Sequence, residues 1–283
     1  MAQALARLRN RGYERSTEET NVSQSQLETN ARKLIALRES AGKTELPAPP
    51  ADLAEAYALQ FEAERILAAE KGFAPIGWKI GATNAGARAN FKLDDQFLGR
   101  LYAQMTAASP AKLPATPGLY RAYEAEFVIE LGADLDATKA PVDAAAAKAA
   151  TKRVGCAIEM VGSFIPMAPP HGVSSLIADF AGCAKWVQGP MTADFANLDL
   201  DAATVAFSLD GEAKAQGKGA AVDGGPFGAT AWLANALGKL GRALKAGDLI
   251  TTGSAIAPCP YAGDGKKAVA DFGALGKVEV TIG

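Results

Sequence analysis

Acidic side chains interrupt a strongly apolar stretch in the middle of the sequence. The run YEAEFVIEL extends from Tyr123 to Leu131, and its alternation predicts a β-strand with one uniformly apolar face. Glu124 and Glu126 share the opposite face, where side chains two positions apart are about 7 Å from each other. A divalent cation that prefers oxygen ligands can bridge this span. Taken alone, the pair is better explained by a strand with one solvated face.

A third acid, Glu159, favours the metal interpretation. It stands among small and apolar residues in the predicted strand Val154–Ser163. An unpaired buried carboxylate is costly, and a metal ion or a lysine would offset that cost. Lys79, in the apolar stretch IGWKIG, provides such a cation, although a lysine that reaches the surface is the simpler explanation of that residue alone. Three such acids could hold one divalent ion and leave positions open for a chelating substrate.

The composition excludes several classes of function. The chain has 283 residues, of which 49% are hydrophobic and 21% charged, as is typical of a globular protein. A net charge of −2 gives no electrostatic reason to expect nucleic acid or an anionic membrane as a partner. No apolar run is long enough to predict a membrane span. Three widely spaced cysteines, an odd number, predict a reducing, cytoplasmic setting without a disulfide framework.

The order of patterns along the chain predicts an α+β protein. We expect residues 1–22 to form a poorly ordered tail, although a targeting segment remains an alternative for this stretch. Residues 23–75 are predicted to be a helical N-terminal segment, with its strongest helix over Ala51–Gly72. Residues 76–283 consist mainly of short strands separated by turn residues, and we expect them to form the catalytic domain.

The motifs occur in an order that resembles the fumarylacetoacetate hydrolase superfamily, from about Ser23 to the C-terminus. Within it, the chain is most similar to the branch of 2-keto-4-pentenoate hydratases and 4-oxalocrotonate decarboxylases. The resemblance implies a helical N-terminal segment followed by a mixed β-sandwich-roll domain. The stretches that carry it are GWKIG, YEAEFVIELGADL, AIEMVGS, LKAGDLITTGS and ADFGALGKVEVTIG.

The resemblance also implies a site and a cofactor. It implies Mg²⁺ or Mn²⁺ held by three acids, a small 2-oxo acid as substrate, and assembly into a homo-oligomer. The implied residues are Glu124, Glu126 and Glu159 as metal ligands, Lys79, Asp94 and Ser163 as catalytic residues, and Thr252, Gly253 and Ser254 around the substrate.

Two departures from the family pattern change the expected pocket. Phe164 stands where related hydratases often have an arginine, which weakens any claim about a second carboxylate on the substrate. Phe97 replaces the second acid of an acidic block that begins near Asp94. Both changes make the predicted pocket more apolar, so that an alkyl or aromatic substituent on the substrate becomes plausible.

The favoured function is the metal-dependent addition of water to a 2-hydroxy-2,4-dienoate, which gives a 4-hydroxy-2-oxo acid. Decarboxylation of a 2-oxo acid, of the 4-oxalocrotonate or oxaloacetate type, is the main alternative, because the same pocket can stabilise an enolate. Hydrolysis of a C–C bond in an acylpyruvate is less favoured. Hydrolases of this superfamily pair a histidine with a glutamate near the N-terminal lid, whereas His171 follows the third acid. A non-catalytic family member is the last alternative.

Overall fold

The computed structural model describes residues 17–283, with side chains from residue 24 onward. Most of the predicted tail or targeting segment, residues 1–22, lies outside this range. The first described helix, α2, covers Thr17–Glu39 and therefore begins before the boundary at residue 22 that the sequence suggested. The apolar spacing used to place the helix starts only at Leu27, so the sequence pattern could not show the preceding turns.

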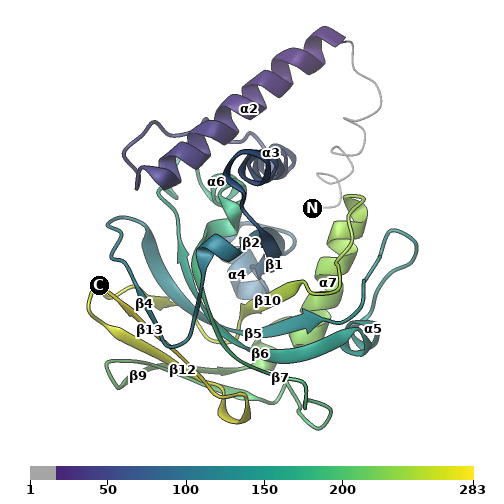
Figure 1. Ribbon diagram of the computed structural model, residues 1–283, viewed down its shortest axis with the longest axis vertical. Coiled ribbons are helices and arrows are strands. Elements are labelled where there is room, and N and C mark those ends of the chain that lie inside the picture. Colours follow the sequence, from purple (N-terminus) through teal and green to yellow (C-terminus); the bar gives the residue numbers. More distant parts are fainter. Residues whose placement is uncertain (1–16) are drawn as a thin grey trace.

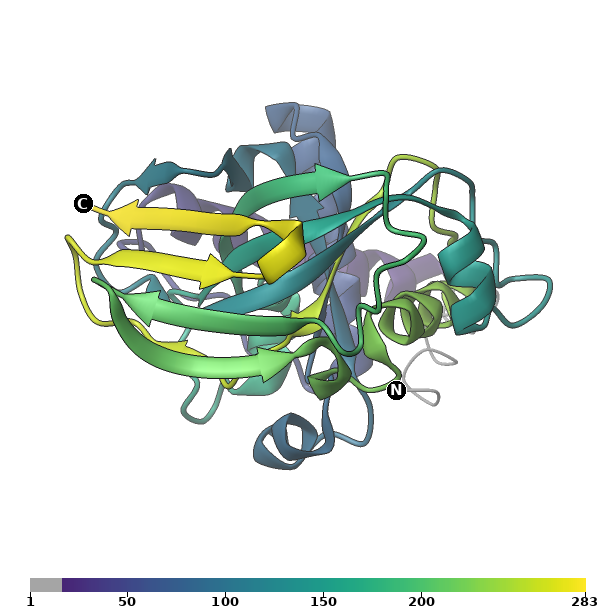
Figure 2. The ribbon, with the colours of Figure 1, turned by 90° about the horizontal axis from the view of Figure 1, so that it is seen from below.

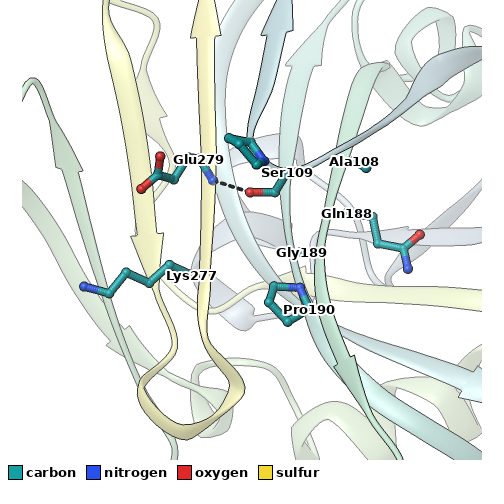
Figure 3. Close-up of a pocket in the computed structure, with 8 residues that line it drawn as sticks. Ala108, Ser109, Gln188, Gly189, Pro190, Lys277 and Glu279 are labelled. Carbon is teal, nitrogen blue, oxygen red and sulfur yellow. Dashed lines mark hydrogen bonds between the residues drawn. The ribbon is translucent and has the colours of Figure 1, made fainter.

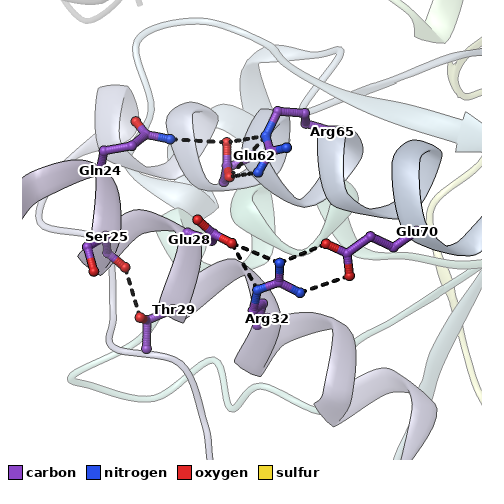
Figure 4. Close-up of polar contacts among 8 residues, drawn as sticks. All are labelled: Gln24, Ser25, Glu28, Thr29, Arg32, Glu62, Arg65 and Glu70. Carbon is purple, nitrogen blue, oxygen red and sulfur yellow. Dashed lines mark hydrogen bonds and ion pairs between the residues drawn. The ribbon is translucent and has the colours of Figure 1, made fainter. Parts of the chain in front are cut away.

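The N-terminal helices α2 and α3 (Leu53–Lys71) lie side by side at the top of the molecule in Figure 1. They run in the same direction, since Gln24 meets Glu62 and Arg32 meets Glu70 (Figure 4). The Arg32 pair is exposed and contributes little to stability. Burial of apolar side chains such as Leu34 on α2 holds the two helices together.

Helix α3 is also attached to the body of the protein through buried polar groups. The Tyr57 hydroxyl accepts a hydrogen bond from the Leu98 amide (3.2 Å), and the Gln60 amide donates to the carbonyls of Leu98 (3.3 Å) and Ile177 (2.5 Å). Asp52 caps the start of α3 by accepting a hydrogen bond from the Glu55 amide (2.9 Å). The helical segment is thus fixed to the edge of a sheet.

Two mixed β-sheets form the rest of the fold. Figure 2 shows the smaller sheet in front of the larger one. In spatial order, the larger sheet contains β2 (Phe97–Tyr102), β1 (Pro75–Gly81), β10 (Leu249–Ser254), β5 (Tyr120–Leu131), β6 (Thr151–Gly162), β7 (Cys183–Thr192) and β3 (Thr106–Ala108), with β11 (Cys259–Pro260) paired to β5. The smaller sheet contains β4 (Ala111–Leu113), β13 (Lys277–Ile282), β12 (Lys267–Asp271), β8 (Thr204–Leu209) and β9 (Glu212–Lys218).

Short helices connect these strands. They are α4 (Ala85–Phe91), α5 (Ala144–Ala149), α6 (Val173–Ala178) and α7 (Gly225–Lys239), with the 3₁₀ turns η1 (Ala103–Met105), η2 (Phe180–Gly182), η3 (Gly219–Ala221) and η4 (Gly273–Leu275). The predicted α+β class, with a helical N-terminal part and mixed sheets, is confirmed.

The apolar face of β5 packs against the smaller sheet. Phe127 lies edge-on to Phe272 with ring centroids 5.2 Å apart, and Tyr123 lies 5.6 Å from Phe207. Both β5 residues are fully buried, as the alternation predicted. The opposite face of β5 therefore points away from this core, and it carries Glu124 and Glu126.

Strand β2 and the turn η2 approach each other closely at Gly99. A Cβ atom on Gly99 would lie 2.6 Å from the Ala181 Cβ and 2.6 Å from the Phe180 carbonyl oxygen. We therefore expect Gly99→Ala to lower the free energy of unfolding by about 1–3 kcal/mol, measured by urea denaturation.

Gly228→Ala is the matched control for this prediction. It lies within α7, and its nearest atom to an added Cβ is the Asp223 carbonyl oxygen at 3.6 Å. An alanine there should leave stability unchanged or raise it by up to about 1 kcal/mol. Equal stabilities of Gly99→Ala and the unmodified protein would contradict the close packing of η2 on β2.

Candidate metal centre and active site

The pairing of β5 with β6 brings the three acids together. Glu124 stands directly opposite Glu159, and Glu126 lies two positions further along β5 on the same face. Each residue offers one carboxylate oxygen, and these three oxygens all lie within 4.8 Å of one another. Atoms at that spacing can surround a single divalent ion. Glu126 and Glu159 are completely buried, whereas Glu124 is half-buried.

Two buried carboxylate oxygens in this cluster have no hydrogen-bond donor among the described residues. They are Oε1 of Glu126 and Oε2 of Glu159. The other oxygen of Glu126 accepts hydrogen bonds from the Thr251 hydroxyl and from the Gly253 amide (3.1 Å). Leaving charged oxygens buried without a partner is costly. A hard cation between the three acids would satisfy them, so the donor set fits Mg²⁺ or Mn²⁺.

Lys79 faces the same cluster from β1. Its ammonium nitrogen lies 2.9 Å from Oε1 of Glu159 and donates a hydrogen bond to the Ala181 carbonyl (2.9 Å). Burial disfavours the charged ammonium, but the carboxylates of Glu159, Glu124 and Glu126 outweigh it and raise the Lys79 pKa above its usual range. Lys79 therefore carries a proton within reach of the acids, instead of extending to the surface.

Glu124 and Glu126 hold their protons more tightly than isolated glutamates, because the pKa of each is raised. Burial, with a further contribution from Glu159, raises the pKa of Glu124 to about 7, although Lys79 opposes the shift. Burial and the neighbouring Glu159 and Glu124 raise the pKa of Glu126 well above its usual range. Without a cation, the cluster cannot carry three negative charges near neutral pH.

These shifts predict how the stability of the metal-free protein depends on pH. The folded Glu124 binds its proton more tightly than the unfolded residue. Its contribution to the free energy of unfolding is therefore fully present below about pH 4.5 and is lost as pH rises through about 7. We expect urea denaturation in the presence of EDTA to show this loss between pH 5 and pH 8. A metal ion competes with protons for the acids, so added Mg²⁺ should stabilise the protein increasingly as pH rises.

The Glu126→Gln variant is the control for this pH profile. It removes one titrating acid from the cluster, so its metal-free stability should fall less steeply over the same range. The expectation fails if the two profiles are parallel, or if the unmodified metal-free protein gains stability relative to the variant as pH rises.

The T-G-S motif on β10 consists of Thr252, Gly253 and Ser254. Gly253 and Thr251, the residue that precedes the motif, both support the acid cluster. The pairing of β10 with β5 is irregular between Thr251 and Ser254, and this bulge directs both the Thr251 hydroxyl and the Gly253 amide to Glu126. Gly253 has a φ of 96°, and a Cβ there would lie 2.3 Å from the Thr83 hydroxyl oxygen. The hydroxyls of Thr252 and Ser254 are directed to the carbonyls of Phe127 (3.2 Å) and Ile256 (2.9 Å).

Ser163 belongs to a second buried polar group next to the cluster. Its hydroxyl donates to the Asp179 carboxylate (2.6 Å) and accepts from the Ile165 amide (3.0 Å). Asp179 also forms an ion pair with Arg38 from helix α2. Sequence reasoning missed Arg38 and Asp179. An acid in the apolar stretch SSLIADFAGCAKW was the available signal, of the same kind that drew attention to Glu159.

Asp94 lies apart from the acids, in the loop between α4 and β2, where it is exposed. With its neighbour Phe97, it lines a small cavity of about 80 Å³. The Phe97 ring connects this cavity to the cluster, because its centroid lies 5.8 Å from the Lys79 ammonium nitrogen. The only histidine, His171, is hydrogen-bonded to Ser175 (3.0 Å) at the start of α6.

Apolar side chains form the wall of the sheet around the acids. Trp186 on β7 stands directly opposite Glu159 and is completely buried, and its indole nitrogen has no acceptor among the described residues. It belongs to a small cluster that contains Leu101, Val128, Ala157, Cys183 and Trp186. This wall excludes water from one side of the acids and strengthens their electrostatic interactions.

A larger open pocket of about 620 Å³ lies elsewhere, between β7 and β13 (Figure 3). None of the three acids lines it. Its charged side chains already have partners, because Lys277 pairs with Asp271 (2.9 Å) and Glu279 with Lys267 (2.7 Å). We therefore place the candidate active site at the buried acids and not at the wider opening.

The fold is shared with solved structures of enzymes such as 4-oxalocrotonate decarboxylase and fumarylpyruvate hydrolase. The 4-oxalocrotonate decarboxylase from Pseudomonas putida G7, in a structure complexed with magnesium and adipate, superimposes with a TM-score of 0.83 over 92% of this chain and 98% of its own. Its sequence identity of 24% limits this likeness to the fold. No protein-family model matches the chain.

Relatives with similar sequences show the family to which the chain belongs. The 2-keto-4-pentenoate hydratase of Burkholderia vietnamiensis is 31% identical over 248 residues, which are 86% of this chain and 93% of the relative. The 2-hydroxyhexa-2,4-dienoate hydratase of Comamonas testosteroni is 33% identical over 221 residues, or 77% and 82% of the two chains. The protein belongs to the 2-keto-4-pentenoate hydratase family, whose named members are hydro-lyases. Among the described helices, none combines the length and apolarity needed to cross a bilayer.

Proposed function

We propose that this protein is a metal-dependent hydratase that converts a 2-hydroxy-2,4-dienoate into a 4-hydroxy-2-oxo acid. The observation that carries the proposal is the cluster of three carboxylates with two unpartnered buried oxygens beside the protonated Lys79. The relatives named as hydratases support the same reaction. We assign Glu124, Glu126 and Glu159 as the ligands of Mg²⁺ or Mn²⁺. When bound, the ion supplies Lewis-acid polarisation of the substrate's C2 oxygen and carboxylate.

The residues of the chain have separate parts in this reaction. Thr251 and Gly253 orient Glu126 and leave its other oxygen free. The Lys79 ammonium provides a positive charge and a movable proton next to the bound oxo acid. The substrate loses its C2 hydroxyl proton and gains a proton at C5, after which water adds its oxygen to C4 and a proton goes to C3. Reactants and products then differ by one water molecule.

The remaining predicted residues keep supporting parts in the proposal. Ser163 acts through Asp179, since its hydroxyl already donates a hydrogen bond to Asp179 and accepts one from the Ile165 amide. The T-G-S backbone around Gly253 forms the border of the substrate site, because the side chains of Thr252 and Ser254 are directed to carbonyls. Asp94 would exchange protons only from the exposed loop that it occupies.

The substrate is proposed to carry an apolar group beyond C4. Phe97 replaces the acid expected at its position, and its ring lies beside Lys79, where the carbon chain of a bound dienoate would extend. An alkyl or aromatic substituent buried there gains roughly 0.8 kcal/mol per CH₂ group. The predicted cytoplasmic location and homo-oligomeric assembly also belong to this proposal.

The test is an Mg²⁺-dependent assay on a panel of 2-hydroxydienoates, 4-oxalocrotonate, oxaloacetate and an acylpyruvate. We expect loss of the dienol absorbance with formation of a 4-hydroxy-2-oxo acid and without release of CO₂. Release of CO₂ from 4-oxalocrotonate would instead support the decarboxylase alternative, which the shared fold keeps open. Cleavage of the acylpyruvate alone would contradict both.

A further inference from the structure

The turn that follows α6 determines where the Lys79 ammonium lies. Residues 179–183 connect α6 to β7 and contain η2. The carbonyl of Ala181, in the middle of this turn, accepts the hydrogen bond of Lys79. The ammonium is thus held between the Ala181 carbonyl and the Glu159 carboxylate, at 2.9 Å from each. Any displacement of the turn would therefore move the proton of Lys79 relative to the acids.

This turn has a conformation that it would not keep unaided. Phe180 has a φ of 51° and Ala181 a φ of 54°, so two consecutive residues with side chains occupy the left-handed region. For residues other than glycine, that region is unfavourable, and a bulky residue such as phenylalanine is rarely found there. Such strain persists only where surrounding contacts impose it.

Arg38, near the end of α2, makes those contacts. Its guanidinium donates hydrogen bonds to the carbonyls of Asp179 (3.1 Å) and Cys183 (3.1 Å), the first and last residues of the turn. It also forms an ion pair with the Asp179 carboxylate and lies 5.1 Å from the centre of the Phe180 ring. One side chain from the helical segment therefore holds both ends of the strained turn.

The contacts of Arg38 exclude a simpler role, the direct binding of a substrate carboxylate. An arginine near an acid-binding pocket often clamps a substrate carboxylate directly. Here the Nε atom and one terminal nitrogen are directed to the turn, and the other terminal nitrogen faces the sulfur of Met105. The side chain is only 15% exposed. The guanidinium has no free pair of donors with which to bind a substrate in two-point fashion.

We propose that Arg38 is a positioning residue for Lys79: it fixes the strained turn 179–183, whose Ala181 carbonyl aims the ammonium at Glu159. The inference deepens the proposed function and rests on it only in taking Lys79 as the group that moves a proton. It assigns to the N-terminal helical segment an influence on the reaction that is transmitted through the turn 179–183.

The first test is Arg38→Met, which keeps most of the side-chain volume and removes the donors. We expect kcat for dienoate hydration to fall by more than about tenfold, while KM changes by less than about threefold, because proton movement and not binding is impaired. Two measurements need no substrate. Thiol labelling of Cys183 and reductive methylation of Lys79, both read by peptide mass, should each become at least about fivefold faster as the turn opens.

A second substitution separates positioning from general structural support. Ala181→Gly removes the cost of the left-handed conformation at that residue. In the background of Arg38→Met it should restore kcat by about fivefold, because the turn then needs less support to keep its shape. Arg32→Met is the matched control from the same helix. Arg32 pairs with Glu28 and Glu70 on the surface (Figure 4), so its loss should leave kcat and both labelling rates unchanged.

The possible results distinguish a positioning role of Arg38 from direct binding of substrate by Arg38. If Arg38→Met raises KM alone and leaves both labelling rates unchanged, Arg38 binds substrate and the proposal is wrong. If Arg38→Met does not fold, the pair Arg38→Met/Asp179→Asn avoids a lone buried charge and should show the same loss of kcat and the same faster labelling. If the unmodified protein hydrates no dienoate, the proposed function fails, whereas the labelling rates still decide whether Arg38 holds the turn.

Discussion

Glu126→Gln should abolish turnover without weakening the metal-free protein. The substitution mimics the protonated form that burial already favours, and the amide oxygen can accept the hydrogen bonds of Thr251 and Gly253. We expect the metal-free variant to be as stable as the unmodified protein, or more stable, because one of three clustered acids no longer ionises. The loss of a ligand should reduce turnover by at least about 100-fold.

Metal-dependent stabilisation gives the decisive measurement for this variant. A divalent ion at 100 times its dissociation constant stabilises the protein that binds it by about 2.7 kcal/mol. We expect Mg²⁺ to raise the thermal midpoint of the unmodified protein and to leave that of Glu126→Gln unchanged. Glu130→Gln is the control, because Glu130 lies on the same strand face but pairs with Lys152 and Arg153 outside the cluster. If Mg²⁺ still stabilises Glu126→Gln, the assignment of the metal centre to these three acids is wrong.

Lys79→Met should have the opposite effect on metal binding and the same effect on turnover. Removing a positive charge from beside the acids should leave the affinity for Mg²⁺ equal or higher, since the ion no longer competes with an ammonium for Glu159. Turnover should nevertheless fall by about 10²–10⁴-fold, because the proton carried by Lys79 is lost. Isothermal titration with Mg²⁺ and the dienoate assay measure the two effects separately.

Stability adds a further expectation for Lys79→Met. Without its cation, the metal-free protein retains buried acids that are no longer compensated, and breaking such a pair costs about 3–5 kcal/mol. Protonation of the acids should reduce this cost at low pH. Lys185→Met is the control, since Lys185 also donates to a backbone carbonyl, that of Gln104 (3.2 Å), but belongs to the other face of β7. Loss of Mg²⁺ binding in Lys79→Met would contradict the assignment of separate roles.

The sequence predicted the members of the acid cluster because alternation along a strand is a local property. Glu124 and Glu126 had to share a face of β5, and the apolar surroundings of Glu159 indicated burial. That Glu159 stands opposite Glu124 depends on the register between β5 and β6, which no local pattern specifies. The resemblance to a known family, and not periodicity, linked the two strands.

The supporting residues could not be predicted in the same way. Thr251 precedes the T-G-S motif and reaches Glu126 only because β10 has a bulge at that point. Arg38 looks like one of many charges on an amphipathic helix, and its partner Asp179 lies 141 residues further along the chain. Such contacts are set by tertiary packing, so the sequence gives no spacing from which to infer them.

The attachment of α3 to β2 also has a consequence for how copies of the chain can meet. Strand β2 forms one border of the larger sheet, and a border strand normally offers unpaired amide and carbonyl groups to any passing polypeptide. At Leu98 both groups are already taken, by Tyr57 and Gln60. A strand from another polypeptide could not pair with β2 at Leu98 unless α3 first detached. The helix therefore prevents the sheet from being extended at this edge, as happens in fibrils.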